Sequence, residues 1–386
     1  MIRALVACAK NSRNLQEVPY TLKTGGCDIV DVLCSMKSSL LRNSYHDNWI
    51  EYDRDKDDFK SMLFNAVQNT NYDWIILGDD TTIKIMNDAI NDEQLFKKIL
   101  PMNKMEHRSM LSSKIGLSEV CEKLSIVTPK YRVIENESQL EDAMANLKFP
   151  VLTKVDVSQG GRGIRYCKNG DELKAVFRHH DHTYKLIVQE FIKGKDVGAE
   201  ALYKDGKLLA YNVCEVLEYM EGAFGRTSKR RYFYSTDVES LLIELGEKAG
   251  INGFASIQYI YDEKEKLYYL VESDLRPNIW VPSSKFTGSD FTTAIKRFLN
   301  LLPITQDCYK PKDYNKTYMV ALFNRDVTRC VKNVDLLDLF KWFLSYKYWK
   351  FIPTYDQKLF RHLMRYTYND VKNTIIISVK KKLKRA

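Results

Sequence analysis

The sequence lacks the features of several common protein classes. Its eight cysteines form no C-x-x-C pair, and several lie in apolar runs such as residues 4–8. A disulfide framework or a structural zinc site is therefore not expected. No stretch reaches the roughly 18 apolar residues of a membrane span, and the apolar run before Lys10 is too short for a signal peptide. We expect reduced, buried thiols and a cytoplasmic location.

Familiar catalytic and nucleotide-binding patterns are also missing. The glycine-rich run at residues 158–163 has the spacing of neither a dinucleotide-binding fingerprint nor a P-loop. No combination of Ser, Cys and His suggests a nucleophilic triad. The cluster of His179, His180 and His182 has no partnering cysteine, so a solvated loop is the preferred interpretation over a zinc site. We see no internal repeat, and the only low-complexity segment is the terminal lysine run.

What is present is an ordinary globular composition with a basic excess. Hydrophobic residues make up 45% and charged residues 28% of the 386 positions, which suits two or three domains with real cores. The net charge of +9 favours anionic partners such as nucleotides, nucleic acid or a membrane surface. Residues 380–386 include five Lys or Arg, and a solvated terminus is the simplest interpretation of that run.

The order of apolar segments predicts an α/β region followed by a mostly β region. Short apolar runs at 4–8, 28–33 and 74–77 are typical of buried parallel strands, and residues 57–68 have helical spacing. From 186 to 275 strands dominate, apart from one helix around 238–248. The chain then becomes aromatic and basic. Residues 336–343 are amphipathic, and an amphipathic core helix is the preferred interpretation of residues 341–351.

Lysines and glycines suited to phosphate binding come first along the chain. Lys154 ends an apolar strand four residues before the glycine-rich run, where its charge would be held by a rigid element. Lys114, near the start of a capped helix, would supply a second charge. In the run itself, converging backbone N–H groups and Arg162 would contact phosphate oxygens. Alone, each lysine fits a surface position and the run fits a plain turn.

A second segment suits a nucleoside. Residues 188–192 form an apolar strand candidate whose backbone, at a sheet edge, would hydrogen-bond an adenine, and Asp196 would contact the ribose hydroxyls. A strand followed by a turn at Gly194 is the simpler interpretation of this segment by itself.

The most informative segment is the strand ending in Glu272, Asp274 and Arg276. Residues two apart on a strand project from the same face, so the two carboxylates lie side by side and favour a hard cation such as Mg²⁺. Arg276, two residues further along, would project from the same face and contact an anion. Gln258, on the neighbouring strand candidate, would add a neutral oxygen ligand. This pattern is unusual for a purely structural strand end.

Together these residues resemble the ATP-grasp superfamily, in particular its carbamoyl phosphate synthetase large chain-like and amino-acid ligase-like branch. The resemblance rests on the order of Lys114, Lys154, the glycine-rich run, residues 189–192 and the E-x-D-x-R segment, and it covers about residues 1–305. The family usually ends this last motif as E-x-N-x-R, so Asp274 is a departure that would bear on metal or nucleotide preference. No second synthetase half or glutaminase signature is present.

The resemblance implies a fold and a division into domains. It implies a mixed α/β and α+β chain, with a Rossmann-like pre-ATP-grasp domain at 1–105 followed by a two-lobed ATP-grasp domain. The small lobe would span 106–185 and the large lobe, with the metal site, 186–305. A basic, aromatic helical extension would follow at 306–386.

The resemblance also implies a reaction, in which ATP phosphorylates a carboxylate and an amine or another nucleophile displaces the phosphate. Mg²⁺ would be held by Gln258, Glu272 and Asp274, and Arg276, Lys154 and Gly161 would be catalytic. The implied nucleotide-binding residues lie in three segments of the chain: Lys114 and Lys154; Ser158, Gly160 and Gly161; and Gln189, Glu190, Phe191, Ile192 and Asp196. The partners would be a small-molecule carboxylate and its acceptor, with a homodimer as the assembly that the family often forms.

Two alternatives stay open at this point. One is a catalytically silent nucleotide-binding protein, against which the paired carboxylates argue. The other is an envelope- or glycan-modifying ligase whose aromatic, basic C-terminus makes peripheral contact with a membrane. A nucleic-acid partner is not expected.

Overall fold

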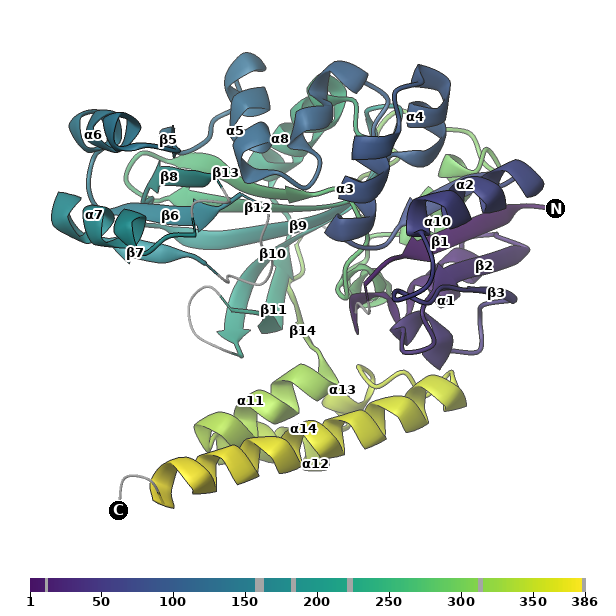
Figure 1. Ribbon diagram of the computed structural model, residues 1–386. Coiled ribbons are helices and arrows are strands. Elements are labelled where there is room, and N and C mark those ends of the chain that lie inside the picture. The colour runs from purple at the N-terminus through teal and green to yellow at the C-terminus, as the bar shows by residue number, and fades with distance from the viewer. Residues whose placement is uncertain (11–12, 157–162, 182–184, 221–224, 312–314, 384–386) are drawn as a thin grey trace.

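The protein was analysed as a computed structural model that describes residues 1–386 except 11–12, 157–162, 182–184, 221–224, 312–314 and 384–386. Three sheets and a C-terminal helical layer follow one another along the chain (Figure 1). In the described residues no helix is both long and apolar enough to cross a membrane.

The N-terminal region is a small parallel sheet with helices around it. Its strand order is β3-β2-β1-β4, and all pairings are parallel. The strands are β1 (Arg3–Cys8), β2 (Ile29–Cys34), β3 (Asn48–Glu51) and β4 (Trp74–Leu77). The helices are α1 (Val18–Thr24), α2 (Phe59–Asn69), α3 (Asp80–Ala89) and α4 (Glu93–Ile99), with short 3-10 turns at Arg13–Leu15, Ser39–Arg42 and Met105–Met110. The three strands and the helix predicted here are confirmed, because β1, β2 and β4 are buried on both faces as their continuous apolar sequences require.

A four-stranded sheet forms a small lobe, in the order β5-β8-β6-β7. Helix α5 (Lys114–Lys123) precedes it, and the lobe itself contains β5 (Tyr131–Ile134), α6 (Glu137–Asn146), β6 (Val151–Val155), β7 (Arg165–Cys167), α7 (Gly170–Arg178) and β8 (Leu186–Glu190). Strands β6 and β7, which lie on either side of the glycine-rich run in the sequence, pair antiparallel. The domain boundary predicted at 185 falls just before β8, whose pairing with β5 and β6 keeps it in this sheet.

The large lobe is a six-stranded antiparallel sheet in the order β13-β12-β9-β10-β11-β14. Its elements are β9 (Lys195–Lys204), β10 (Lys207–Tyr219), β11 (Thr227–Phe233), α8 (Thr236–Ala249), β12 (Gly253–Asp262), β13 (Leu267–Asp274), a 3-10 turn at Val281–Ser283, α9 (Ser284–Thr287), α10 (Phe291–Phe298) and β14 (Tyr318–Ala321). Strand β14 lies within the predicted helical extension, so residues 318–321 belong to the sheet. Sequence patterning missed β11, whose run of charged residues hides its strand character.

The N-terminal sheet and the large lobe share their cores. Leu5 and Leu77 belong to the same buried cluster as Ala199 and Tyr203, and Trp74 stacks on Phe254 with ring centroids 5.1 Å apart. The small lobe has a separate core around Ile134 and Val188. The two lobes of the central domain are thus distinct packing units, and the N-terminal region is fixed to the larger one.

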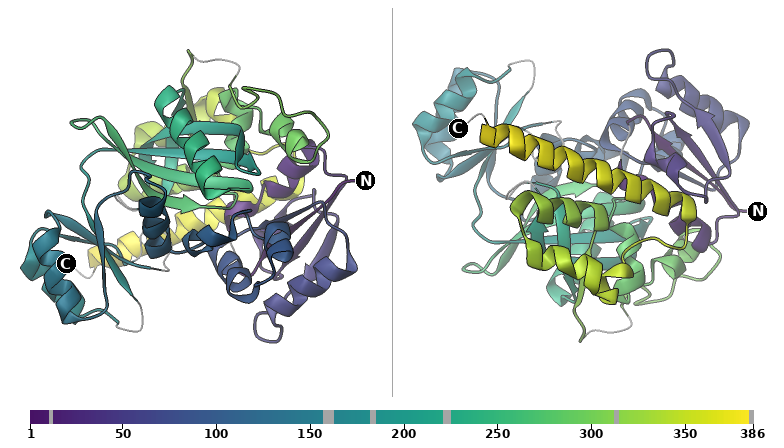
Figure 2. Two further views of the ribbon diagram at one scale, coloured as in Figure 1. Left: turned by 90° about the horizontal axis from the view of Figure 1, so that it is seen from above. Right: turned by 90° about the horizontal axis from the view of Figure 1, so that it is seen from below.

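The C-terminal extension is a helical layer along one side of the molecule, seen clearly from below in Figure 2. It consists of α11 (Phe323–Asn333), α12 (Leu336–Leu344), α13 (Tyr346–Trp349) and the long α14 (Gln357–Leu383). The core helix predicted at 341–351 is wrong, because α12 ends at Leu344 and α13 begins at Tyr346. Trp342 and Tyr348 are buried, but Leu344 is 81% and Tyr346 75% exposed.

All eight cysteines are free thiols, as the sequence predicts. Seven are buried, and Cys308 is half-buried.

Candidate active site

The strand pair β12–β13 brings the predicted metal ligands together. Glu272 lies directly opposite Gln258, and Asp274 lies opposite Ser256 in the same antiparallel register. Strand alternation puts Glu272 and Asp274 on one face. The arrangement expected from the E-x-D-x-R segment is therefore present as backbone geometry.

Arg276 connects this strand end to the N-terminal region. Its guanidinium forms a bidentate pair with Asp80, with Nε 2.6 Å from Oδ1 and Nη2 2.9 Å from Oδ2, and it also donates to Asp274 at 2.7 Å. Burial raises the pKa of Asp274 well above its ordinary value; Arg276 opposes this effect, while Asp80 and Glu272 add to it. Three carboxylates thus surround one guanidinium.

Asp80 is a site residue that the sequence indicates only as part of the Asp79–Asp80 pair, which resembles a metal pair but is more simply interpreted as a helix N-cap. Asp79 does cap α3, by accepting from the Thr82 N–H at 2.9 Å. Asp80, the first residue of the helix, points instead to Arg276. Its partner lies 196 positions away in the sequence, so local spacing gave no signal for it.

Lys154 lies buried in the small lobe beside the same site. Its Nζ donates to Gln189 Oε1 at 2.7 Å, and Gln189 in turn donates to Ser118 Oγ at 3.1 Å. Burial lowers the pKa of Lys154 to about 8; Glu272 opposes the shift and Lys114 adds to it. Lys114 and Lys154, the two predicted phosphate-binding lysines, therefore lie close enough to Glu272, a predicted metal ligand, for their charges to interact.

Helix α5 fixes the position of Lys114. Ser113 caps the helix by accepting from the Gly116 N–H at 2.9 Å. Asp156, just after β6, accepts from Ser113 Oγ and from the Ile115 N–H at 2.9 Å each, and its backbone carbonyl accepts from Lys114 Nζ at 3.0 Å. Asp156 therefore joins the start of α5 to the strand that carries Lys154, a role with no signal in the sequence.

The predicted adenine contact needs a correction. Strand β8 lies between β5 and β6 and is not an edge, so the Gln189 and Glu190 backbones are paired within the sheet. The Phe191 N–H donates to the Pro150 carbonyl at 3.0 Å. Among the described residues, no backbone hydrogen bond involves the Ile192 N–H. Of residues 189–192, only the backbone at Ile192 fits the predicted contact with adenine.

The remaining predicted nucleotide-binding residues are placed differently. Asp196, on β9, accepts a hydrogen bond from the Tyr219 hydroxyl, and burial raises the pKa of its carboxyl group. Ser158, Gly160 and Gly161, with Arg162, lie outside the described residues.

A cleft of about 850 Å³ opens over the assembled residues. Lys114, Glu272, Asp274 and Arg276 line it, together with Asp80 and the N-terminal Lys10. Its far wall comes from the C-terminal extension, through residues of α11 and α14: Phe323, Asn324, Arg325, Leu363, Tyr366 and Asp370. Three regions of the chain therefore meet in one cleft.

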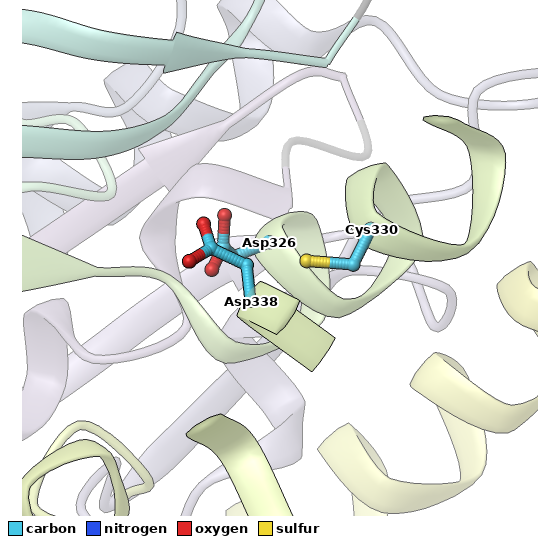
Figure 3. A group of neighbouring side chains, drawn as sticks. All are labelled: Asp326, Cys330 and Asp338. Carbon is cyan, nitrogen blue, oxygen red and sulfur yellow. The ribbon is translucent and has the colours of Figure 1, made fainter. Parts of the chain in front are cut away.

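Another acidic cluster has metal-ligand residue types but different surroundings. Ligand atoms of Asp326, Cys330 and Asp338 lie within 4.8 Å of one another (Figure 3). Arg329 donates to Asp326 at 2.9 Å and to Asp338 at 2.8 Å, and Lys229 pairs with both carboxylates. Burial raises the pKa of the Cys330 thiol to about 12, so it stays protonated. Because cations already neutralise the carboxylates, this cluster joins α11 and α12 to β11 and does not suit a metal ion.

The basic stretch at 226–231 is mostly structural. Lys229 belongs to the junction just described. Arg230 pairs with buried Glu200 at 2.5 Å and lies 4.4 Å from the Trp280 ring centroid. Asn278 also contacts this carboxylate, because it donates to Glu200 as well as to Ser256. Only Arg226 of this stretch lines the cleft.

Comparisons with known proteins agree with this geometry. Residues 119–217 match the family model of the ATP-grasp domain. A carbamoyl-phosphate synthase of Methanobrevibacter smithii is 22% identical over 176 residues, covering 44% of this chain and 47% of that protein. The chain thus spans less than half the length of this relative.

Two solved structures share the fold. An N5-carboxyaminoimidazole ribonucleotide synthetase, in its ADP complex, has a TM-score of 0.65 at 14% identity, covering 86% of this chain and 85% of the other. The biotin carboxylase domain of Hydrogenobacter thermophilus 2-oxoglutarate carboxylase, crystallised as a dimer with MgADP and bicarbonate, has a TM-score of 0.61 at 16% identity, covering 82% and 74%. The chain therefore contains an ATP-grasp domain, and its fold is that of the ATP-grasp ligases.

Proposed function

We propose that this protein is an ATP-dependent ligase that activates a carboxylate as an acyl phosphate and transfers the acyl group to an amine or another nucleophile. ADP and phosphate are the other products. The observation that carries the proposal is the meeting of Asp80, Glu272, Asp274 and Arg276 at an open cleft beside Lys114 and Lys154. Both solved structures with this fold were crystallised with adenine nucleotides.

The residues at the cleft fit Mg²⁺. Asp80 and Asp274 pair with a single guanidinium, and both burial and the nearby Glu272 disfavour the charge on Asp274. A hard cation with oxygen ligands would relieve the repulsion between Glu272 and Asp274. Glu272 and Asp274 would hold the ion, with Gln258 opposite Glu272 as a weaker ligand. When bound, Mg²⁺ would supply charge neutralisation on the phosphates of ATP.

Two lysines of the chain would also bind the phosphates of ATP. Lys154 and Lys114 converge from β6 and α5, and both are held by hydrogen bonds, so their charges are positioned before the nucleotide arrives. A loose phosphoryl-transfer transition state needs positioning and charge more than covalent chemistry. Arg276 would stabilise the oxyanion of the acyl phosphate or of the tetrahedral intermediate.

Adenine would lie beyond Phe191, where the backbone leaves the small-lobe sheet near Ile192, with Asp196 as the ribose contact. The glycine-rich run, including Ser158, Gly160 and Gly161, would cover the γ-phosphate. The side-chain bond between Gln189 and Lys154 assigns Gln189 to positioning that lysine.

The acceptor would occupy the part of the cleft that is walled by Phe323, Leu363 and Tyr366. Arg226 and Lys10 also line the cleft. Apolar and aromatic surface beside cations suits an acceptor with an apolar body and an anionic group. A cytoplasmic location and a homodimer remain predictions.

The test is ADP release by the purified protein with Mg-ATP over a matrix of carboxylates and amines. Substrate-dependent ADP release that is lost in a Glu272→Ala/Asp274→Ala double variant supports the ligase and identifies its substrate class. Nucleotide binding without turnover on any pair supports the catalytically silent alternative. Absence of nucleotide binding contradicts the proposal.

A further inference from the structure

The outer face of helix α12 is apolar and exposed to solvent. Five large apolar residues among its nine are more than half exposed: Leu336, Leu337, Phe340, Phe343 and Leu344. Spacings of three, four and seven residues place them on neighbouring rows of one broad helix surface. Tyr346 and Trp349 of α13 continue it at 75% and 52% exposed. Soluble proteins rarely display so many large apolar side chains together unless something covers them.

Packing does not require this surface. The inner side of α12 is complete, because Trp342 is buried against Phe323 and Tyr348 and donates to Asp326 at 2.9 Å. Asp338 also points inward, to Arg329 and Lys229. The outer residues therefore contribute little to holding α12 in place, and the fold gives no reason for their apolar character.

Charge is distributed unevenly between this layer and the rest of the chain. Residues 323–386 contain fifteen Lys or Arg and five Asp or Glu, a net charge of +10, whereas the whole chain carries +9. The preceding 322 residues therefore sum to −1. The basic excess belongs to the helical layer as a whole and is not confined to the terminal lysine run.

The long helix α14 presents part of this charge on its outer side. Lys358, Arg361, Arg365 and Lys372 are all exposed, at helical spacings that place them in one stripe. Tyr368, 67% exposed, lies within the same stripe. The opposite side of the helix carries Leu363, Tyr366 and Asp370, which line the cleft. One helix thus faces the candidate active site with one side and solvent with its basic side.

We propose that the outer surface of the helical layer, formed by the apolar face of α12 and the basic stripe of α14, docks on an anionic membrane surface. Amphipathic helices bind the membrane interface through apolar and aromatic side chains, and basic residues add attraction to anionic lipids. Two such signals together are what stable peripheral binding requires. Figures 1 and 2 show α11, α12 and α14 as one layer beside the rest of the molecule, which suits contact with an extended surface.

Other occupants fit less well. A second copy meeting this face through the same surface would bring two strongly positive layers together, which like-charge repulsion opposes. Nucleic acid would satisfy the charge and could stack on the aromatic rings, but it offers no partner for Leu336, Leu337 and Leu344. The docking proposal does not depend on the ligase proposal, because none of its surface residues lines the cleft.

The experiment is cosedimentation of the full chain with phosphatidylcholine vesicles, with and without phosphatidylserine. We expect binding only to the phosphatidylserine vesicles, weakening as salt is raised. A Leu337→Glu/Phe340→Glu/Leu344→Glu variant should lower the partition coefficient by at least about tenfold. Arg361→Gln/Arg365→Gln should lower it by about tenfold or more. Leu267→Glu, a matched control at a 43% exposed apolar position on β13, should bind as the wild type does.

Several results would overturn the proposal. One is absence of phosphatidylserine-dependent binding; another is wild-type binding by the apolar triple variant. Light scattering that shows a dimer lost in that variant would assign the face to self-association. Vesicle-independent binding of a single-stranded oligonucleotide, lost in both variants, would assign it to nucleic acid. Thermal unfolding and nucleotide binding, measured on every variant, separate loss of docking from loss of fold.

Discussion

The molecule contains two buried ionic clusters that join distant parts of the chain, and they differ in how their carboxylates are paired. At the cleft, Asp80 and Asp274 pair with the one guanidinium of Arg276, and the nearby Glu272 further disfavours the charge on Asp274. At the junction of the helical layer, Asp326 and Asp338 are matched by Arg329 and Lys229.

The pKa values of one carboxyl group in each cluster, Asp338 at the junction and Asp274 at the cleft, shift in opposite directions. Burial works against the charge on Asp338, yet hydrogen bonds from Lys229 and Lys341 outweigh it and lower the pKa of this carboxyl. For Asp274, burial prevails over Arg276 and the pKa is raised. A cluster whose carboxylates are each paired with cations holds the fold together, whereas neighbouring carboxylates that repel one another beside a cleft are suited to receive a cation. The variants below test this distinction.

The largest effect is expected on turnover, when Glu272 and Asp274 are replaced. Replacing Glu272 and Asp274 by Ala removes the proposed metal ligands, so ADP release should fall by at least about 10³-fold, because metal-ion charge stabilisation is worth several kcal/mol. Thermal stability should change little or rise, since burial already disfavours the Asp274 charge. An Asp262→Ala/Glu265→Ala variant removes the same charge from the far end of the β12–β13 hairpin and should keep wild-type turnover. Loss of stability without loss of turnover would reverse our assignment of this cluster.

At the junction we expect the opposite, a loss of stability. Asp326→Ala removes the fully buried carboxylate that pairs with Arg329, which is 2% exposed, and with Lys229, and leaves both cations to share Asp338. The free energy of unfolding should therefore fall by about 3–5 kcal/mol. Asp335→Ala removes a half-buried carboxylate from the same arginine and should cost about 1 kcal/mol or less. Urea unfolding of both variants measures the difference. Equal losses would mean that burial at the junction does not govern its energetics.

Sequence patterning anticipated one of these clusters and not the other, for a physical reason. Glu272, Asp274 and Arg276 lie two residues apart on a strand, so period-two alternation alone places them on one face. The junction pairs β11 with helices about 100 positions later, and Asp80 meets Arg276 across 196 positions. Such pairings depend on how the sheets pack, which local spacing does not encode.

The same reasoning explains the errors in the fold. The strands of the N-terminal sheet were predictable because burial on both faces demands continuous apolar runs. The position of β8 was not, because strand order within a sheet depends on long-range pairing, and this misplaced the edge backbone assigned to adenine. The apolar residues of α12 predicted burial, yet most of them face solvent.

A smaller effect is expected where the N-terminal region supports the cleft. Asp80→Asn keeps an oxygen acceptor for Arg276 but removes its charge, so the guanidinium should be held less firmly and kcat should fall by about tenfold. Nucleotide affinity should stay close to that of the wild type, because Asp80 is not proposed to contact the nucleotide. The control is Asp88→Asn, at an exposed position near the end of the same helix, which should leave kcat unchanged. A loss of nucleotide affinity with unchanged kcat would contradict a positioning role for Asp80.

The last effect, and the one that depends most directly on burial, concerns Lys154. Its pKa is lowered to about 8 from an ordinary value of 10.5, so the lysine loses its charge as the pH rises through 8, while the unfolded chain keeps its proton up to about 10.5. Between these values the unfolded state binds more protons, and the stability of the wild type relative to Lys154→Met should therefore rise with pH, by up to about 3 kcal/mol.

Nucleotide binding should change in the opposite direction. A neutral Lys154 no longer attracts phosphate, so ADP affinity should fall by up to about tenfold for each pH unit above 8. Lys154→Arg keeps its charge throughout this range and should show a flat profile, because the guanidinium pKa lies far above it. Lys185→Arg, at an exposed position, should retain the wild-type profile. Calorimetric titrations of ADP from pH 7 to 10 compare the three proteins. A wild-type profile as flat as that of Lys154→Arg would show that burial does not lower the pKa of this lysine, or that its charge does not contact the phosphates.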